Sequence, residues 1–118
     1  MNPYDAIRVH WEWRIQLRLF VTGHGAPFDA STAGRDDLCD LGMWIRGDGA
    51  RYAALPSLAH LKSAHAAFHQ AAAEVVKRVD DGDRDGARAL LEPSSSFDHA
   101  SNATVLAILR LASDLASA

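Results

Sequence analysis

Three histidines and the only cysteine of the chain occupy positions that helical periodicity turns toward a protein core. His65 and His69 are four residues apart, so their rings project from one helix face about a turn apart. His10 lies in the apolar stripe of an earlier segment, and Cys39 lies beside the apolar face of another. Burying an imidazole without a partner costs about 1–3 kcal/mol, so several in one core need a shared explanation. One thiolate and three imidazoles form a complete tetrahedral ligand set for Zn²⁺.

Each of these residues also has an ordinary structural explanation. A single inward histidine is more often a core residue with a hydrogen-bond partner, and a lone HxxxH pair can arise by chance in an alanine-rich helix. A lone cysteine usually behaves as a small buried hydrophobe. The coincidence of all four nevertheless favours a metal site, whose predicted ligands are His10, Cys39, His65 and His69.

Zinc fits this ligand set better than the other metals considered. A di-iron bundle needs Glu-x-x-His repeats on paired helices. Glu12, Glu74 and Glu92 are not followed by histidine at that spacing. Copper would accept the same ligand types, and its coordination geometry cannot be read from a sequence.

Four segments with helical periodicity must position the ligands. The first has Asn2 as N-cap and Pro3 at its first position. The second runs from about Asp36 to Arg46, and the third ends at Gly82. The fourth starts near Asp83, and Pro93 breaks or kinks it. The predicted core stripes are Ala6, His10, Trp13, Leu17 and Phe20, then Leu58, Leu61, His65, Phe68, Ala72, Val75 and Val79, then Phe97, Ser101, Thr104, Ile108 and Leu111. The pattern predicts an all-α fold, an antiparallel four-helix bundle.

The bulk composition indicates one domain over residues 1–118, since 48% hydrophobic content is ample for a core. The net charge is −3 and the twelve basic residues are scattered, so we expect neither nucleic acid nor a membrane surface as a partner. No signal peptide is visible, and the apolar segment TVLAILRLASDLA is too short to span a bilayer. One cysteine cannot form an internal disulfide, which favours a cytoplasmic location.

The motifs resemble those of the chemoreceptor zinc-binding domain family, called CZB. The order is histidine with a following aromatic residue, then Cys-x-apolar-Gly-x-Trp, then HxxxH. There are 28 residues (11–38) between the first histidine and the cysteine, and 25 residues (40–64) between the cysteine and the HxxxH pair. The matching stretches read His10-Trp11-Glu12-Trp13, Cys39-Asp40-Leu41-Gly42-Met43-Trp44 and His65-Ala66-Ala67-Phe68-His69. The resemblance covers most of the chain.

The resemblance implies a four-helix bundle, usually a homodimer, with one zinc ion per subunit on the four residues named above. Members look like regulatory modules of bacterial chemoreceptors, which act in chemotaxis, or of diguanylate cyclases. Zinc occupancy or oxidation of the cysteine ligand is thought to change the output. No output domain follows within the 118 residues, so we expect a signalling partner in trans.

Two alternatives to a sensor stay open at this point. The zinc could be a permanent structural staple of a dimeric interaction module, or the chain could be a metal-free bundle with satisfied core histidines. An enzyme is not expected, because four protein ligands leave no open position for an activated water.

Several neighbouring residues carry their own expectations. Gly42 costs about 1 kcal/mol in a helix interior, so we expect it to let a facing helix or its histidine come close. Trp13 and Trp44 are expected to line the metal site and exclude water from it. Asp40 or Asp98 is expected to orient a ligand histidine through its second nitrogen.

The remaining histidines and a second apolar stripe are assigned to the surface. His24 lies in a glycine-rich loop, and His60 and His99 lie off the core stripes. The second stripe of the first helix consists of Trp11, Ile15 and Leu19. We expect it to form a dimer interface, unless the loop over residues 22–34 folds over it.

Overall fold

The computed structural model describes residues 2–117, so the predicted domain bounds 1 and 118 lie just outside it. These residues form six α-helices and one 3₁₀ helix, with no strand among them. The elements are α1 (Pro3–Val21), α2 (Ala30–Ala33), α3 (Asp40–Arg46), η1 (Asp48–Tyr52), α4 (Pro56–Asp80), α5 (Arg84–Leu90) and α6 (Ser96–Ser117). The prediction of an all-helical chain is therefore confirmed for the described residues.

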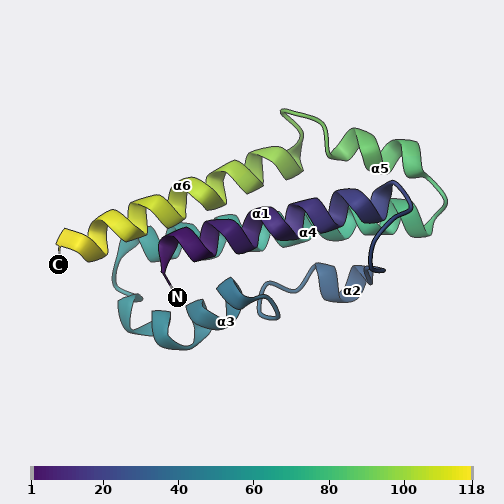
Figure 1. Cartoon of the computed structure of the whole chain (residues 1–118). Coiled ribbons are helices and arrows are strands. Elements are labelled where there is room, and N and C mark those ends of the chain that lie inside the picture. The colour runs from purple at the N-terminus through teal and green to yellow at the C-terminus, as the bar shows by residue number, and fades with distance from the viewer. Residues whose placement is uncertain (1, 118) are drawn as a thin grey trace.

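The fold is elongated, with extents of 48 × 25 × 19 Å. In Figure 1, α1 and α4 run in the same direction and α6 returns in the opposite direction. The chain also returns through α2 and α3, which lie along one side of the molecule (Figure 1). Helix α4 contacts α1, α2, α5 and α6, so it is the central element of the fold.

The helix ends follow local chemistry that the sequence already contains. Asn2 accepts hydrogen bonds from the backbone N–H groups of Tyr4 and Asp5, which caps α1 as expected. Gly82 has a φ of +83° just after α4, a conformation that favours glycine. Pro93 lies between the end of α5 at Leu90 and the start of α6 at Ser96.

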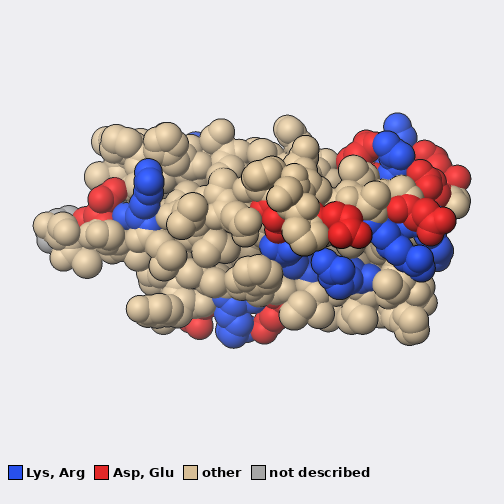
Figure 2. All heavy atoms as spheres, turned by 90° about the horizontal axis from the view of Figure 1, so that it is seen from above, with Lys and Arg blue, Asp and Glu red and all other residues tan. Residues whose placement is uncertain are grey.

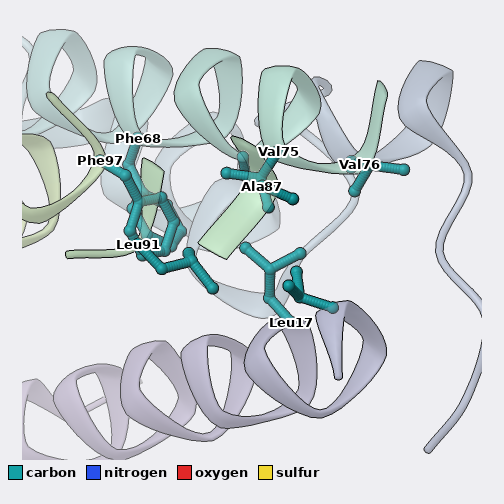
Figure 3. Close-up of a cluster of buried hydrophobic side chains, with 10 residues drawn as sticks. Leu17, Phe68, Val75, Val76, Ala87, Leu91 and Phe97 are labelled. Carbon is teal, nitrogen blue, oxygen red and sulfur yellow. The ribbon is translucent and has the colours of Figure 1, made fainter. Parts of the chain in front are cut away.

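Two apolar clusters fill the interior. The first is drawn in Figure 3, where α1, α4 and the segment from α5 to α6 meet. It contains Leu17, Val21, Ala33, Phe68, Ala72, Val75, Val76, Ala87, Leu91 and Phe97. The second cluster joins the other halves of the long helices to α3, and it contains Ala6, Leu41, Ile45, Leu58, Leu61, Ala107, Ile108 and Leu111. Every residue of the three predicted stripes is buried or half-buried.

Two of the predicted metal ligands, His10 and His65, lie between these two clusters along the long helices. On α1, His10 lies between Ala6 of the second cluster and Leu17 of the first. On α4, His65 lies between Leu61 and Phe68 in the same way. The fold therefore builds a short polar layer between two apolar ones.

The second predicted helix was placed wrongly at its start. It begins at Asp40 rather than near Asp36, because Cys39 has extended backbone geometry (φ −83°, ψ 163°). The loop over residues 22–34 contains the unexpected short helix α2 and leaves Trp11, Ile15 and Leu19 exposed. The alternative in which this loop covers the stripe is therefore wrong. Within residues 2–117, no helix combines the length and the apolar character that crossing a membrane requires.

Candidate metal centre

Three potential ligand atoms converge where the N-terminus of α3 meets the middle of α4. The Sγ atom of Cys39 lies 3.1 Å from Nε2 of His65 and 3.6 Å from Nε2 of His69. The two Nε2 atoms are 3.1 Å apart. Both histidines are buried and Cys39 is half-buried. The structure thus brings together three of the four predicted ligands.

The separations fit a tetrahedral zinc ion. Zn–S and Zn–N bonds of about 2.3 and 2.0 Å at tetrahedral angles put sulfur and nitrogen about 3.5 Å apart, and two nitrogens about 3.3 Å apart. The adjoining cavity measures about 20 Å³ and is lined by all four predicted ligands, with Trp13 and Phe68 among the apolar walls. That volume admits one water-sized occupant.

The orientation of His69 prepares it for a metal. Its Nδ1 lies 2.9 Å from the carbonyl oxygen of Ala33, to which it must donate a proton. In the neutral ring Nε2 then carries the lone pair, and Nε2 is the atom that faces Cys39 and His65. The expectation that Asp40 or Asp98 would orient a ligand is not met here, because a backbone carbonyl of α2 performs that role. Asp98 instead lies 3.6 Å from Arg14.

Cys39 is placed by the start of α3. It is the N-cap residue, and its sulfur accepts a hydrogen bond of 3.3 Å from the N–H of Gly42. Burial raises the pKa of the thiol above its ordinary value, while hydrogen bonds from the N–H groups of Gly42 and Leu41 act in the opposite direction. A positive metal ion would favour the thiolate further.

Gly42 is needed for a reason different from the one expected. A side chain at this position would overlap the carbonyl oxygen of Asp36 and approach Asp37. The close neighbour is thus the backbone of the turn before Cys39, and not a facing helix or its histidine. This turn folds back onto the first turn of α3 and so fixes the direction of the Cys39 side chain.

His10 lines the same cavity but is held apart from the other three. Neither of its nitrogens belongs to the group whose ligand atoms all lie within 4.8 Å of one another. Its Nε2 forms a hydrogen bond of 2.7 Å with Oγ of Ser101 on α6. Its ring also packs against Phe68, with centroids 4.4 Å apart.

The comparison with known families agrees with this geometry. A family model for the chemoreceptor zinc-binding domain, CZB, matches residues 10–76. The chain belongs to the CZB family. The matched range includes all four predicted ligands, and three of them form the cluster that could bind a metal. No curated protein and no solved structure matches the chain.

The two tryptophans of the CZB motifs have different places. Trp13 packs edge-on against His69, with ring centroids 5.0 Å apart, and it lines the cavity beside the predicted ligands. Trp44 lies in the second apolar cluster beside Tyr52, away from the cavity, and the expectation that it lines the metal site is wrong. His24, His60 and His99 are exposed, as expected.

Three residues around the CZB site were not assigned to it from the sequence. Ser101 and Arg14 contact each other and Ser101 contacts His10, while Ala33 binds His69 through its carbonyl. The sequence could have indicated a role for Ser101, since it is a polar residue in the middle of an apolar stripe. The sequence could not have indicated Ala33, because its contact uses the backbone carbonyl group, which every residue type has.

An open cleft of about 490 Å³ reaches the site from the surface between α1 and the segment from α2 to α3. Cys39 and His69 line it together with Phe28 and Arg35. The cleft gives solvent and small solutes a path to the thiol.

We expect the stability of the folded domain to fall as the pH drops below about 6.5. Burial lowers the pKa of His10 to about 3 and that of His65 to about 4, and it also lowers the pKa of His69. Between these values and 6.5 the unfolded chain binds protons that the folded chain does not, so acid favours unfolding. The loss between pH 7 and pH 5 should be about 2 kcal/mol for each of His10 and His65.

Urea denaturation at the two pH values, with a chelator present to remove metal, measures this loss. The His60→Ala variant is the control, because it removes an exposed histidine of α4 and leaves the three buried rings in place. A free energy of unfolding that stays constant between pH 7 and pH 5 would contradict the burial argument.

Proposed function

We propose that this CZB domain is a zinc-binding regulatory module, in which zinc occupancy or oxidation of Cys39 changes helix packing. The observation that carries the proposal is the convergence of Cys39, His65 and His69 at the separations of a tetrahedral site. His10, which lines the same cavity, is the proposed fourth ligand. A bound zinc ion would supply one positive centre shared by ligands from α1, α3 and α4.

The residues of the chain prepare that centre without the metal. Ala33 holds the proton of His69 on Nδ1, and burial keeps the rings neutral, so their lone pairs are available. The Gly42 N–H directs the sulfur of Cys39 toward the histidines. Because Cys39 also lines the open cleft, a small oxidant can reach it and remove the negative charge of the thiolate.

The two apolar clusters favour a sensor over a permanent staple. They contain eighteen buried apolar residues, and none of them belongs to the proposed ligand set. A core of this kind supplies most of the driving force for folding by itself. The domain should therefore release zinc and remain folded.

Chelation of the zinc-loaded protein tests this point. We expect zinc to be removed while the helical circular-dichroism signal and a cooperative thermal transition are retained. Loss of the helical signal together with zinc would contradict the sensor and support the structural staple. A parallel titration of the zinc-loaded wild type with an oxidant should release zinc as the free thiol of Cys39 is consumed.

A catalytic role is not part of the proposal. The cavity lined by the four proposed ligands has room for one water-sized occupant. When His10 completes the set, four protein ligands close the coordination sphere.

The proposed architecture is an antiparallel four-helix bundle in which two of the four elements are interrupted. Helices α1 and α4 would be the unbroken elements, α2 and α3 would share the second, and α5 and α6 would share the fourth with its break near Pro93. The alternating directions of these elements in Figure 1 support this description.

The proposed partners are a second copy of the chain and a signalling protein of the bacterial chemoreceptor or diguanylate cyclase type, acting in the cytoplasm. Trp11, Ile15 and Leu19 leave an apolar stripe on α1, and Leu106 and Leu109 of α6 are also exposed. Figure 2 shows that charged side chains gather at the end that holds α5, with few over the rest of that face. Sedimentation equilibrium should give the mass of a dimer, and a monomer at all concentrations would contradict this part of the proposal.

A further inference from the structure

His10 is attached to α6 through a hydroxyl group that is itself firmly held. Ser101 is completely buried, and its Oγ lies 2.7 Å from Nε2 of His10. Arg14 donates a second hydrogen bond of 2.8 Å to the same Oγ. Arg14 fills one acceptor position of the hydroxyl, and in the His10 tautomer that carries its proton on Nδ1, Ser101 donates its own proton to Nε2.

Arg14 is fixed in turn by three neighbours, so the position of the hydroxyl is well defined. Its guanidinium lies 3.6 Å from the carboxylate of Asp98, and both side chains are largely shielded from solvent. The same guanidinium stacks over Trp11 at 4.6 Å and over Phe97 at 5.3 Å. Together these contacts form a polar network between α1 and α6 that includes no other predicted metal ligand.

We propose that Ser101 competes with the metal ion for Nε2 of His10. The inference rests on the proposed function, in which His10 is the fourth ligand. A lone pair on Nε2 can accept the Ser101 proton or bind the metal, but it cannot do both at once. If His10 binds the metal through Nε2, the hydrogen bond from Ser101 to that nitrogen must break, and Ser101 would keep its proton and its bond from Arg14.

Two observations favour competition over simple positioning of His10 by Ser101. The nitrogens of His10 lie outside the 4.8 Å ligand group while Nε2 is bound to Ser101. The other three ligand atoms are already at tetrahedral separations without any change in position. His10 is therefore the ligand that must move, and Ser101 is what it must leave. Metal binding would thereby change a contact of α6, although α6 contributes none of the proposed ligands.

The Ser101→Ala variant tests the competition, with zinc affinity measured against a metal-binding dye. Removing the competing hydroxyl should tighten zinc binding about fivefold, the factor to which a typical net hydrogen-bond contribution converts. Thr104→Val is the matched control. Thr104 is completely buried on the same stripe of α6, but its hydroxyl donates to the carbonyl of Ala100. This control should bind zinc as the wild type does.

A double-mutant cycle shows whether the effect acts through His10. In a His10→Ala background, Ser101→Ala should leave zinc affinity unchanged, because no competing ligand remains. Unchanged or weaker binding by Ser101→Ala alone would overturn the inference, as would tighter binding that persists without His10. Both outcomes leave zinc binding intact. A wild-type protein that binds no zinc would instead overturn the proposed function and this inference together.

Discussion

Replacing Cys39 with serine is expected to lower zinc affinity by more than about 100-fold, which exceeds the effect usual for residues that only support a ligand. The thiolate is the one negatively charged ligand of the proposed set, and a serine hydroxyl is a poor substitute for it. Zinc content after purification without a polyhistidine tag should fall from about one ion per wild-type chain to well below that. Mass spectrometry of both proteins measures the difference.

The Cys39→Ser substitution should remove the ligand without disturbing the fold, because Cys39 lies at the start of α3. Cys39 is the N-cap residue, and serine is among the best N-cap residues. The variant should therefore keep α3 and its circular-dichroism signal while losing the metal. His60→Ala is the matched control, since this exposed histidine on α4 lies only five residues before His65. Zinc retained at wild-type affinity by Cys39→Ser would refute the assigned ligand set.

The Gly42→Ala variant is expected to lose about 2–3 kcal/mol of stability. Helix propensity alone predicts the opposite sign, a gain of about 1 kcal/mol for alanine over glycine inside a helix. The structure decides between the two, because the added methyl group would overlap the carbonyl oxygen of Asp36. The close atoms belong to the backbone of Asp36 and Asp37, so the overlap can be removed only if this turn or α3 shifts. That shift would also displace the sulfur of Cys39 and weaken zinc binding.

Urea denaturation of the wild type and the Gly42→Ala variant, each without zinc, shows whether the substitution lowers or raises the free energy of unfolding. Met43→Ala provides the control in the same helix. Met43 is 54% exposed, so its truncation should change the free energy of unfolding by less than about 0.5 kcal/mol. A Gly42→Ala variant as stable as the wild type would show that the turn before Cys39 relaxes freely.

The apolar stripes were predictable because they depend only on helical periodicity. Each helix has one face toward the interior, so the spacing of residues such as Leu61, His65 and Phe68 is enough to mark it. The same reasoning found His65 and His69 as a pair, because a separation of four residues fixes their relative direction within one helix. The CZB family assignment also depends on residue types and spacing along the chain.

The start of α3 was not predictable in the same way. Asp36 and Asp37 look like the acidic first turn of a helix, but they belong to the turn that folds back against Gly42. Propensity could not distinguish the two cases because the deciding contact is between backbone atoms. The energetic cost of Gly42 inside a helix follows from the sequence, but only the fold shows that the backbone of Asp36 makes a glycine necessary.

The sequence by itself determined the helical class, the inward residues of the three long helices, and three residues that the structure groups as able to hold a metal: Cys39, His65 and His69. Only the tertiary structure decided that Ala33 orients His69, that Cys39 caps a helix, and that Ser101 forms a hydrogen bond with His10. The physical reason is the range of the interactions. Periodicity acts over three or four residues within one helix, whereas the bond from His10 to Ser101 joins residues 91 positions apart on different helices.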